Sequence, residues 1–133
     1  MGPLRNKNVW ITGAGRGIGK AIAVAFGKEK AILALSSRTA GEVKSVSKYI
    51  NKAGGRAHPF QCDVSVETDV IKTVKKINKN LGQVDILINN AGVFRFMSLV
   101  ETSAEDWDMM MNINLKGAFL CTKMILPSMI ERR

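Results

Sequence analysis

The sequence contains few of the residues that build metal sites and disulfide frameworks. Its 133 residues include two cysteines, Cys62 and Cys121, and a single histidine, His58. Because the two cysteines are isolated from each other in the chain, they form neither a metal motif nor a disulfide framework. We therefore expect no metal ion and a reducing, cytoplasmic setting. His58 is expected to be a surface or strand residue and not a catalyst.

Long apolar runs are also missing. No stretch approaches the roughly 20 residues needed to span a bilayer, and the opening residues, MGPLRNKN, lack the apolar core of a secretory signal. We expect no membrane partner. The composition, 46% hydrophobic and 23% charged, is typical of one folded globular domain.

The formal net charge of +9 makes nucleic acid a partner to consider. The basic residues are dispersed, however, and Lys72, Lys75, Lys76 and Lys79 have the spacing of a solvated helix face. No nucleic-acid-binding motif accompanies the charge. We expect no nucleic-acid partner, and a basic surface that assists binding of a phosphorylated cofactor or an acidic carrier.

Apolar, β-favouring runs alternate with helix-like segments along the chain. The predicted strands are residues 8–12, 31–37, 56–62 and 84–90. The predicted helices begin at Ile18, cover 41–53, run from an N-cap at Ser65 to Gly82, and run from Thr102 or Ser103 toward 131 with a kink or interruption at Pro127. This alternation predicts an α/β, Rossmann-like doubly wound parallel sheet with strand order 3-2-1-4.

A glycine cluster follows the first predicted strand and opens the first helix. It reads TGAGRGIG over residues 12–19. Glycines at such a turn let backbone N–H groups approach a pyrophosphate at the helix N-terminus. The spacing Gly13-x3-Gly17-x-Gly19 departs from the usual G-x-G-x-x-G, so a glycine-rich turn without a ligand is the alternative at this point.

Together with three later motifs, the cluster resembles the short-chain dehydrogenase/reductase family. TGAGRGIG matches the family's TGxxxGxG cofactor motif, and NNAG at 89–92 matches its motif after strand 4. CDV at 62–64 matches the adenine-side segment, and NINLKGAF at 112–119 matches the fourth-helix segment. The four motifs stand in the family's order across nearly the whole chain. Within the family, the general similarity is to 3-oxoacyl-acyl-carrier-protein reductases.

The resemblance implies a role for each matching residue. The residues implied to surround the cofactor phosphates are Gly13, Gly15, Arg16, Gly17, Ile18 and Gly19. Those implied to contact the adenine, the adenosine ribose and the nicotinamide side are Asp63, Val64, Asn90, Ala91 and Gly92. Turn formation is the alternative for Asn89 and Asn90. Asn114 matches the family's catalytic asparagine, with Asn112 as its neighbouring competitor.

The residues after the second strand favour NADP over NAD. A carboxylate there would accept from the ribose 2′-OH of NAD and repel a 2′-phosphate. The chain instead has Ser37 followed by Arg38, and Arg16 approaches from the glycine loop. Two guanidinium groups can make charge-assisted hydrogen bonds to the phosphate. Solvent exposure of either arginine is the alternative.

The family's remaining catalytic residues, a serine and Tyr-x-x-x-Lys, have no match in this sequence. Its one tyrosine, Tyr49, falls in the second predicted helix and is followed at position 53 by alanine. We therefore predict that residues 1–133 are the NADP-binding, N-terminal part of an oxidoreductase that acts on a carbonyl or alcohol substrate. The fold would then be truncated after strand 4 and the fourth helix. The alternative is a short, non-catalytic nucleotide-binding or interaction protein.

An unpaired fourth strand and an apolar fourth helix would also favour self-association. Met109, Met110 and Met111 are expected in the core or at an interface. We expect a homo-oligomer.

Overall fold

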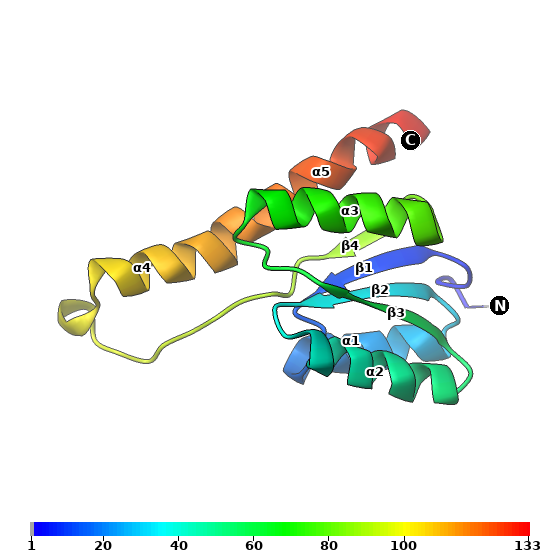
Figure 1. Ribbon diagram of the computed structural model, residues 1–133, viewed down its shortest axis with the longest axis horizontal. Helices are drawn as coiled ribbons and strands as arrows, with labels where there is room; N and C mark the ends of the chain where they lie inside the picture. The colour runs from blue at the N-terminus through cyan, green and yellow to red at the C-terminus, as the bar shows by residue number, and fades with distance from the viewer. Residues whose placement is uncertain (1) are drawn as a thin grey trace.

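β1 (Asn8–Thr12) lies between β2 (Ile32–Ser37) and β4 (Ile86–Ile88) in a four-stranded parallel sheet. β3 (Arg56–Gln61) pairs with β2 at the outer edge. These positions come from a computed structural model that describes residues 2–133 (Figure 1). The order β3-β2-β1-β4 confirms the strand order and the α/β class predicted from the sequence.

Two helical layers cover the sheet (Figure 1). α1 (Gly17–Lys28) and α2 (Ala40–Lys52) lie on one face, and α3 (Glu67–Leu81) and α5 (Gly117–Arg132) lie on the other. The alternation of side chains along β1 divides the core accordingly. Val9 and Ile11 belong to the cluster under α1 and α2, whereas Trp10 belongs to the cluster under α3 and α5.

The helical region after β4 differs from the single helix with a break at Pro127 that the sequence predicted. η1 (Leu99–Glu101) precedes α4 (Ala104–Met111), which Ser103 caps by accepting a hydrogen bond from the Asp106 N–H at 3.0 Å. A π-helical turn, η2 (Asn112–Lys116), then joins α4 to α5. α5 is not interrupted at Pro127. The proline removes one intrahelical hydrogen bond, and the flanking turns keep the helix together.

α3 begins later than the predicted cap. Val66 occupies the N-cap position, so the prediction of Ser65 as N-cap is wrong. The Ser65 hydroxyl donates instead to the Asp63 carboxylate at 2.6 Å. Because the hydroxyl is bound to Asp63, it does not cap the N-terminus of α3.

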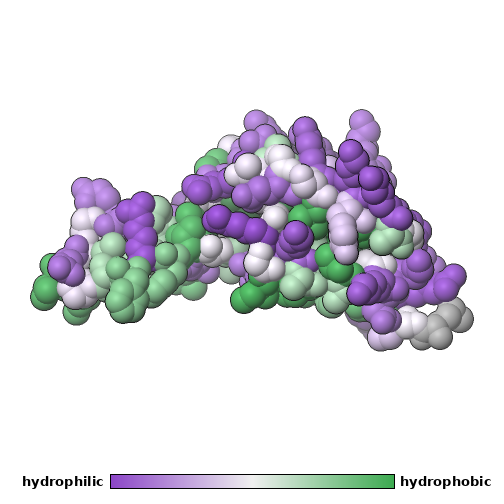
Figure 2. All heavy atoms as spheres, turned by 90° about the horizontal axis from the view of Figure 1, so that it is seen from below, coloured by the Kyte–Doolittle hydropathy of each residue, from purple (hydrophilic) through white to green (hydrophobic). Residues whose placement is uncertain are grey.

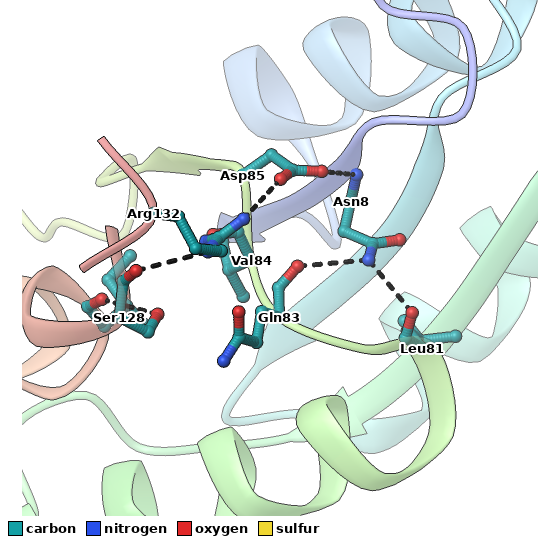
Figure 3. Close-up of polar contacts among 8 residues, drawn as sticks. Asn8, Leu81, Gln83, Val84, Asp85, Ser128 and Arg132 are labelled. Carbon is teal, nitrogen blue, oxygen red and sulfur yellow. Dashed lines mark hydrogen bonds and ion pairs between the residues drawn. The ribbon is translucent and has the colours of Figure 1, made fainter. Parts of the chain in front are cut away.

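A polar cluster joins the last turn of α5 to the amino ends of β1 and β4 (Figure 3). Arg132 donates to the Asp85 carboxylate at 2.8 Å and to the Val84 carbonyl at 2.7 Å. The second Asp85 oxygen accepts from the Asn8 N–H at 2.8 Å.

Among residues 2–133, no helix has the length and apolar character needed to cross a membrane.

Candidate functional site

A cavity of about 530 Å³ opens at the carboxyl edge of the sheet. In a parallel α/β sheet this edge is where ligands bind, at the point where strand order reverses. Apart from Gly19, all the residues predicted to bind a cofactor line this cavity. They are Gly13, Gly15, Arg16, Gly17, Ile18, Ser37, Arg38, Asp63, Val64, Asn90, Ala91 and Gly92. Their contact with a cofactor stays a prediction.

The glycine loop folds tightly against the segment after β4. Gly13 has a φ of +62°, and a Cβ atom there would lie 2.8 Å from the Ala91 Cα. A Cβ at Gly19 would clash with the Gly13 carbonyl and with the Asn90 side chain. Gly19 therefore serves the site through close packing, because it lets α1 begin directly behind the loop.

The N-terminus of α1 offers free backbone donors to the cavity. Its N-cap residue, Arg16, makes no side-chain cap, and the first turn contains no acidic residue. α3 differs, because Glu67 and Asp69 stand in its first turn. Gly17 and Ile18 begin α1 and line the cavity. Unmet N–H groups and the helix dipole at this point suit an anionic group.

Two arginines add positive charge to the same cavity. Arg16 and Arg38 both line it. The ion pairs among residues 2–133 involve Arg95 and Arg132, so neither cavity arginine is held by a carboxylate. Both guanidinium groups are thus free to bind an anion.

Glu42 brings a carboxylate that the sequence did not predict into the cavity. It lies in the first turn of α2, and a Cβ on Gly15 would come within 2.6 Å of its Oε2 atom. The prediction of NADP rests on the lack of an acid at the end of β2, and Glu42 lies beyond that stretch. Because α2 starts at the same edge of the sheet, an acidic residue in its first turn could have indicated a carboxylate in the cavity.

Thr12 and Asn90 fix the relative position of the glycine loop and the β4 end. The buried Thr12 hydroxyl oxygen accepts from the N–H groups of Asn90, at 3.1 Å, and Ala91, at 3.0 Å. The Asn90 side-chain amide donates back to the carbonyls of Thr12 and Gly13, at 3.1 and 3.0 Å. Thr12, at the end of β1, therefore sets the shape of a site whose walls come from both strands.

Asp63 is held by its own neighbours at the far side of the cavity. One carboxylate oxygen accepts from the Ser65 N–H at 3.0 Å and from the Ser65 hydroxyl. The Asp63 N–H donates to Asp69 at 3.3 Å. These contacts orient the carboxylate and leave its second oxygen available to a ligand donor.

Cys62 also lines the cavity but is chemically quiet. Burial raises the pKa of its thiol, and the nearby Asp69 and Asp63 carboxylates raise it further, against a lowering contact with Thr73. A raised pKa leaves little reactive thiolate at neutral pH.

Asn114 is exposed and is not among the residues that line the cavity, but it binds one of them. It lies in the π-helical turn, where its Oδ1 accepts from the Val93 N–H at 2.8 Å and its Nδ2 donates to the Val93 carbonyl at 2.8 Å. Val93 and Ile113 line the cavity, and neither was predicted. Asn114 therefore positions the wall and keeps one amide hydrogen and acceptor capacity free.

The side chains of Tyr49 and His58 take no part in the site. Tyr49 lies on α2 with 59% of its surface exposed, and His58 is exposed on the edge strand β3. Neither is among the residues that line the cavity.

Comparison with known proteins gives these features a context. The profile of the short chain dehydrogenase family matches residues 7–133. A 3-oxoacyl-[acyl-carrier-protein] reductase of Thermotoga maritima is 36% identical over 130 residues, which covers 98% of this chain and 53% of that protein. The chain thus spans about half the length of this relative.

Solved structures show the same architecture. A short-chain dehydrogenase/reductase from Burkholderia xenovorans aligns with a TM-score of 0.94 and 34% identity, over 99% of this chain and 54% of that one. A metagenomic short-chain oxidoreductase solved in complex with NADP aligns with a TM-score of 0.92 and 33% identity, over 97% of this chain and 59% of that one.

Proposed function

Since the chain belongs to the short-chain dehydrogenase/reductase family, we propose that its cavity binds NADP for hydride transfer to or from a carbonyl or alcohol substrate. One observation carries the proposal: two unpaired arginines and the uncapped N-terminus of α1 meet at one cavity. The NADP complex of a structural neighbour supports the same cofactor class.

Different residues of the chain would bind different parts of NADP. The N–H groups at the start of α1 would hold the pyrophosphate, while Arg16 and Arg38 would bind the 2′-phosphate. Asp63 would accept from the adenine amino group. Asn90 would border the ribose, where the Thr12 contacts fix its backbone. When bound, the nicotinamide would supply or accept the hydride.

Asn114 is proposed to hold a water for proton transfer. Its two hydrogen bonds to Val93 fix the amide plane and leave one donor and acceptor capacity for that water. The location in a π-helical turn agrees with this role, since such turns occur frequently at functional sites.

Turnover by these 133 residues is expected to be slight or absent. Tyr49, the one tyrosine, lies on α2 and outside the cavity lining, so the chain places no tyrosine where a proton must be delivered. The second candidate is a non-catalytic nucleotide-binding or interaction protein, whereas membership of the family supports the oxidoreductase.

Fluorescence titration with NADPH and an assay of carbonyl-dependent NADPH oxidation separate the two candidates. We expect saturable binding without oxidation. Oxidation by the purified chain would refute the non-catalytic candidate, and absence of binding would refute the NADP proposal.

We also propose that the chain self-associates through an apolar arm, residues 94–111, which includes η1 and α4. Figure 2 shows apolar side chains gathered on this arm, which projects from the body in Figure 1. Phe96 is 96% exposed, Val100 93% and Leu99 84%. Sedimentation velocity should show oligomers, and a monomer at all concentrations would contradict this.

A further inference from the structure

A second concave surface lies outside the cofactor cavity, between α2 and the edge strand β3. It is a shallow groove of about 550 Å³ that is largely open to solvent. Its lining consists of Lys44, Ser47, Lys48, Asn51, Lys52 and Pro59. We refer to it as the lysine groove. No acidic side chain contributes to this lining.

The three lysines form one row of positive charge. Lys44, Lys48 and Lys52 follow each other at four-residue intervals along α2, so they share one helix face and span about 12 Å. All three are exposed. The ion pairs among the described residues involve other side chains, so no carboxylate neutralises the row.

A buried hydroxyl without a partner lies in the same groove. Ser47 is only 3% exposed, yet its Oγ makes no hydrogen bond. Serine within a helix commonly bonds to the carbonyl four residues earlier, and buried hydroxyls are nearly always paired. The Oγ atom has almost no exposed surface and lies below the floor of the groove, so a ligand oxygen becomes its partner once the side chain turns to a rotamer that faces the groove.

The outer edge of β3 cannot pair with a further strand. The Asn51 side chain binds both the N–H and the carbonyl of Ala57, at 2.8 and 2.9 Å. Pro59 has no N–H to offer. The Ala57 backbone groups are therefore already bound, and Pro59 offers no donor, so strand addition lacks the partners it would use. The groove does not suit an extended peptide.

The lining also lacks the anchors that macromolecules need. No aromatic side chain is present for a base to stack on, and Pro59 is its one apolar residue. What remains is a row of ammonium groups, which are of the kind that make charge-assisted hydrogen bonds to phosphoryl oxygens.

We propose that the lysine groove is a binding site for a small anion carrying two or three linked phosphoryl groups. The row of charges matches such a chain of anionic groups, and the Ser47 hydroxyl, once turned toward the groove, donates to one of its oxygens. This site is separate from the cofactor cavity and does not depend on the proposed function.

The test is calorimetric titration of the full chain with inorganic tripolyphosphate at low salt. Joint replacement Lys44→Gln, Lys48→Gln and Lys52→Gln should weaken binding about tenfold or more. The matched control is Lys72→Gln, Lys76→Gln and Lys79→Gln, which removes the same charge from α3 on the other face of the sheet. Equal weakening by both triple variants would overturn the proposal.

Two further measurements distinguish a specific binding site from general electrostatic attraction. Ser47→Ala should weaken tripolyphosphate binding several-fold, and citrate should bind the unmodified chain more weakly than tripolyphosphate. An unchanged affinity in Ser47→Ala, or equal affinity for citrate, would refute the phosphoryl site.

Amide chemical shifts of the unmodified chain locate the bound anion without any substitution. Tripolyphosphate should shift the amides of residues 44–52. Shifts confined to residues 13–19 and 37–39 would show that the anion occupies the cofactor cavity and would overturn the proposal.

Discussion

Thr12 and Asn90 bind each other's backbone across the ends of β1 and β4. The threonine hydroxyl accepts from the Asn90 N–H at 3.1 Å, and the asparagine side chain donates to the Thr12 carbonyl at the same distance. This reciprocal pair joins the glycine loop to the segment after β4. The two walls of the cavity at the carboxyl edge of the sheet are therefore fixed by residues at the strand ends.

Thr12→Val tests how much this pair contributes to the stability of the fold and to NADPH binding. Valine keeps the shape of the side chain but leaves the partly buried N–H groups of Asn90 and Ala91 without their acceptor. We expect a loss of about 1–3 kcal/mol in the free energy of unfolding and weaker NADPH binding. Urea denaturation measures the first effect. Thr68→Val, at an exposed position of α3, is the control and should change little; equal losses in both variants would contradict the role of Thr12.

Glu42→Gln should strengthen NADPH binding. The Glu42 carboxylate lines the cavity that also holds Arg16 and Arg38, and its charge opposes a 2′-phosphate. Because surface charges are screened, the expected gain is about two- to fivefold in affinity. Fluorescence titration measures it, with Glu67→Gln in the first turn of α3 as the control. Weaker binding in Glu42→Gln would instead indicate that the carboxylate accepts from a cofactor hydroxyl.

Gly117→Ala should destabilise the packing of α5. A Cβ at Gly117 would lie 2.6 Å from the Val64 Cγ2 atom, and overpacking of this kind costs about 1–3 kcal/mol. Gly41→Ala on α2 is a matched control, since a Cβ there meets nothing within 4 Å. That variant should gain about 0.5–1 kcal/mol from helix propensity. Thermal unfolding compares them, and equal gains would refute the close contact with Val64.

Acid should remove the stabilisation that Asp85 provides (Figure 3). Partial burial raises its pKa, but the hydrogen bond from the Asn8 N–H and the Arg132 guanidinium outweigh this, and the net pKa lies below the ordinary 3.8. The folded state therefore favours the ionised carboxylate. Its contribution is complete above the unfolded-state pKa and is lost as pH falls through the lower folded-state value.

Asp85→Asn provides the measurement. Arg132 is 36% exposed at its side chain, so screening limits the expected loss at neutral pH to about 1 kcal/mol. The difference in unfolding free energy from the unmodified chain should shrink as pH falls from 6 to 2. Asp108→Asn, exposed on α4, is the control. A difference that stays constant with pH would contradict the ionic origin.

Local patterns were sufficient to predict most of the sheet. The apolar run ending at a glycine cluster predicted β1 at residues 8–12, as observed. β4 is shorter than the predicted 84–90 at both ends. Val84 and Asp85 accept hydrogen bonds from Arg132 and Asn8, and after Ile88 the Asn90 N–H donates to the Thr12 hydroxyl. Those partners lie far away in the sequence, so no local pattern revealed them.

The same distinction applies to the site. Glycine spacing predicted the loop around Gly13, since backbone conformation is a local property. The placing of Glu42 beside Gly15 and the pairing of Thr12 with Asn90 depend on how α2 and β4 pack. The π-helical turn that carries Asn114 was also missed, because its sequence continues an ordinary helical pattern.

The relative affinity for NADPH and NADH tests the cofactor proposal most directly. Titration of the full chain should show tighter binding of NADPH, because Arg16 and Arg38 are both free to bind its 2′-phosphate. In a variant combining Arg16→Ala with Arg38→Asp, the preference should fall about 10- to 100-fold, with thermal unfolding showing that the fold is kept. An NADPH/NADH affinity ratio that is the same in both proteins would contradict the proposed site.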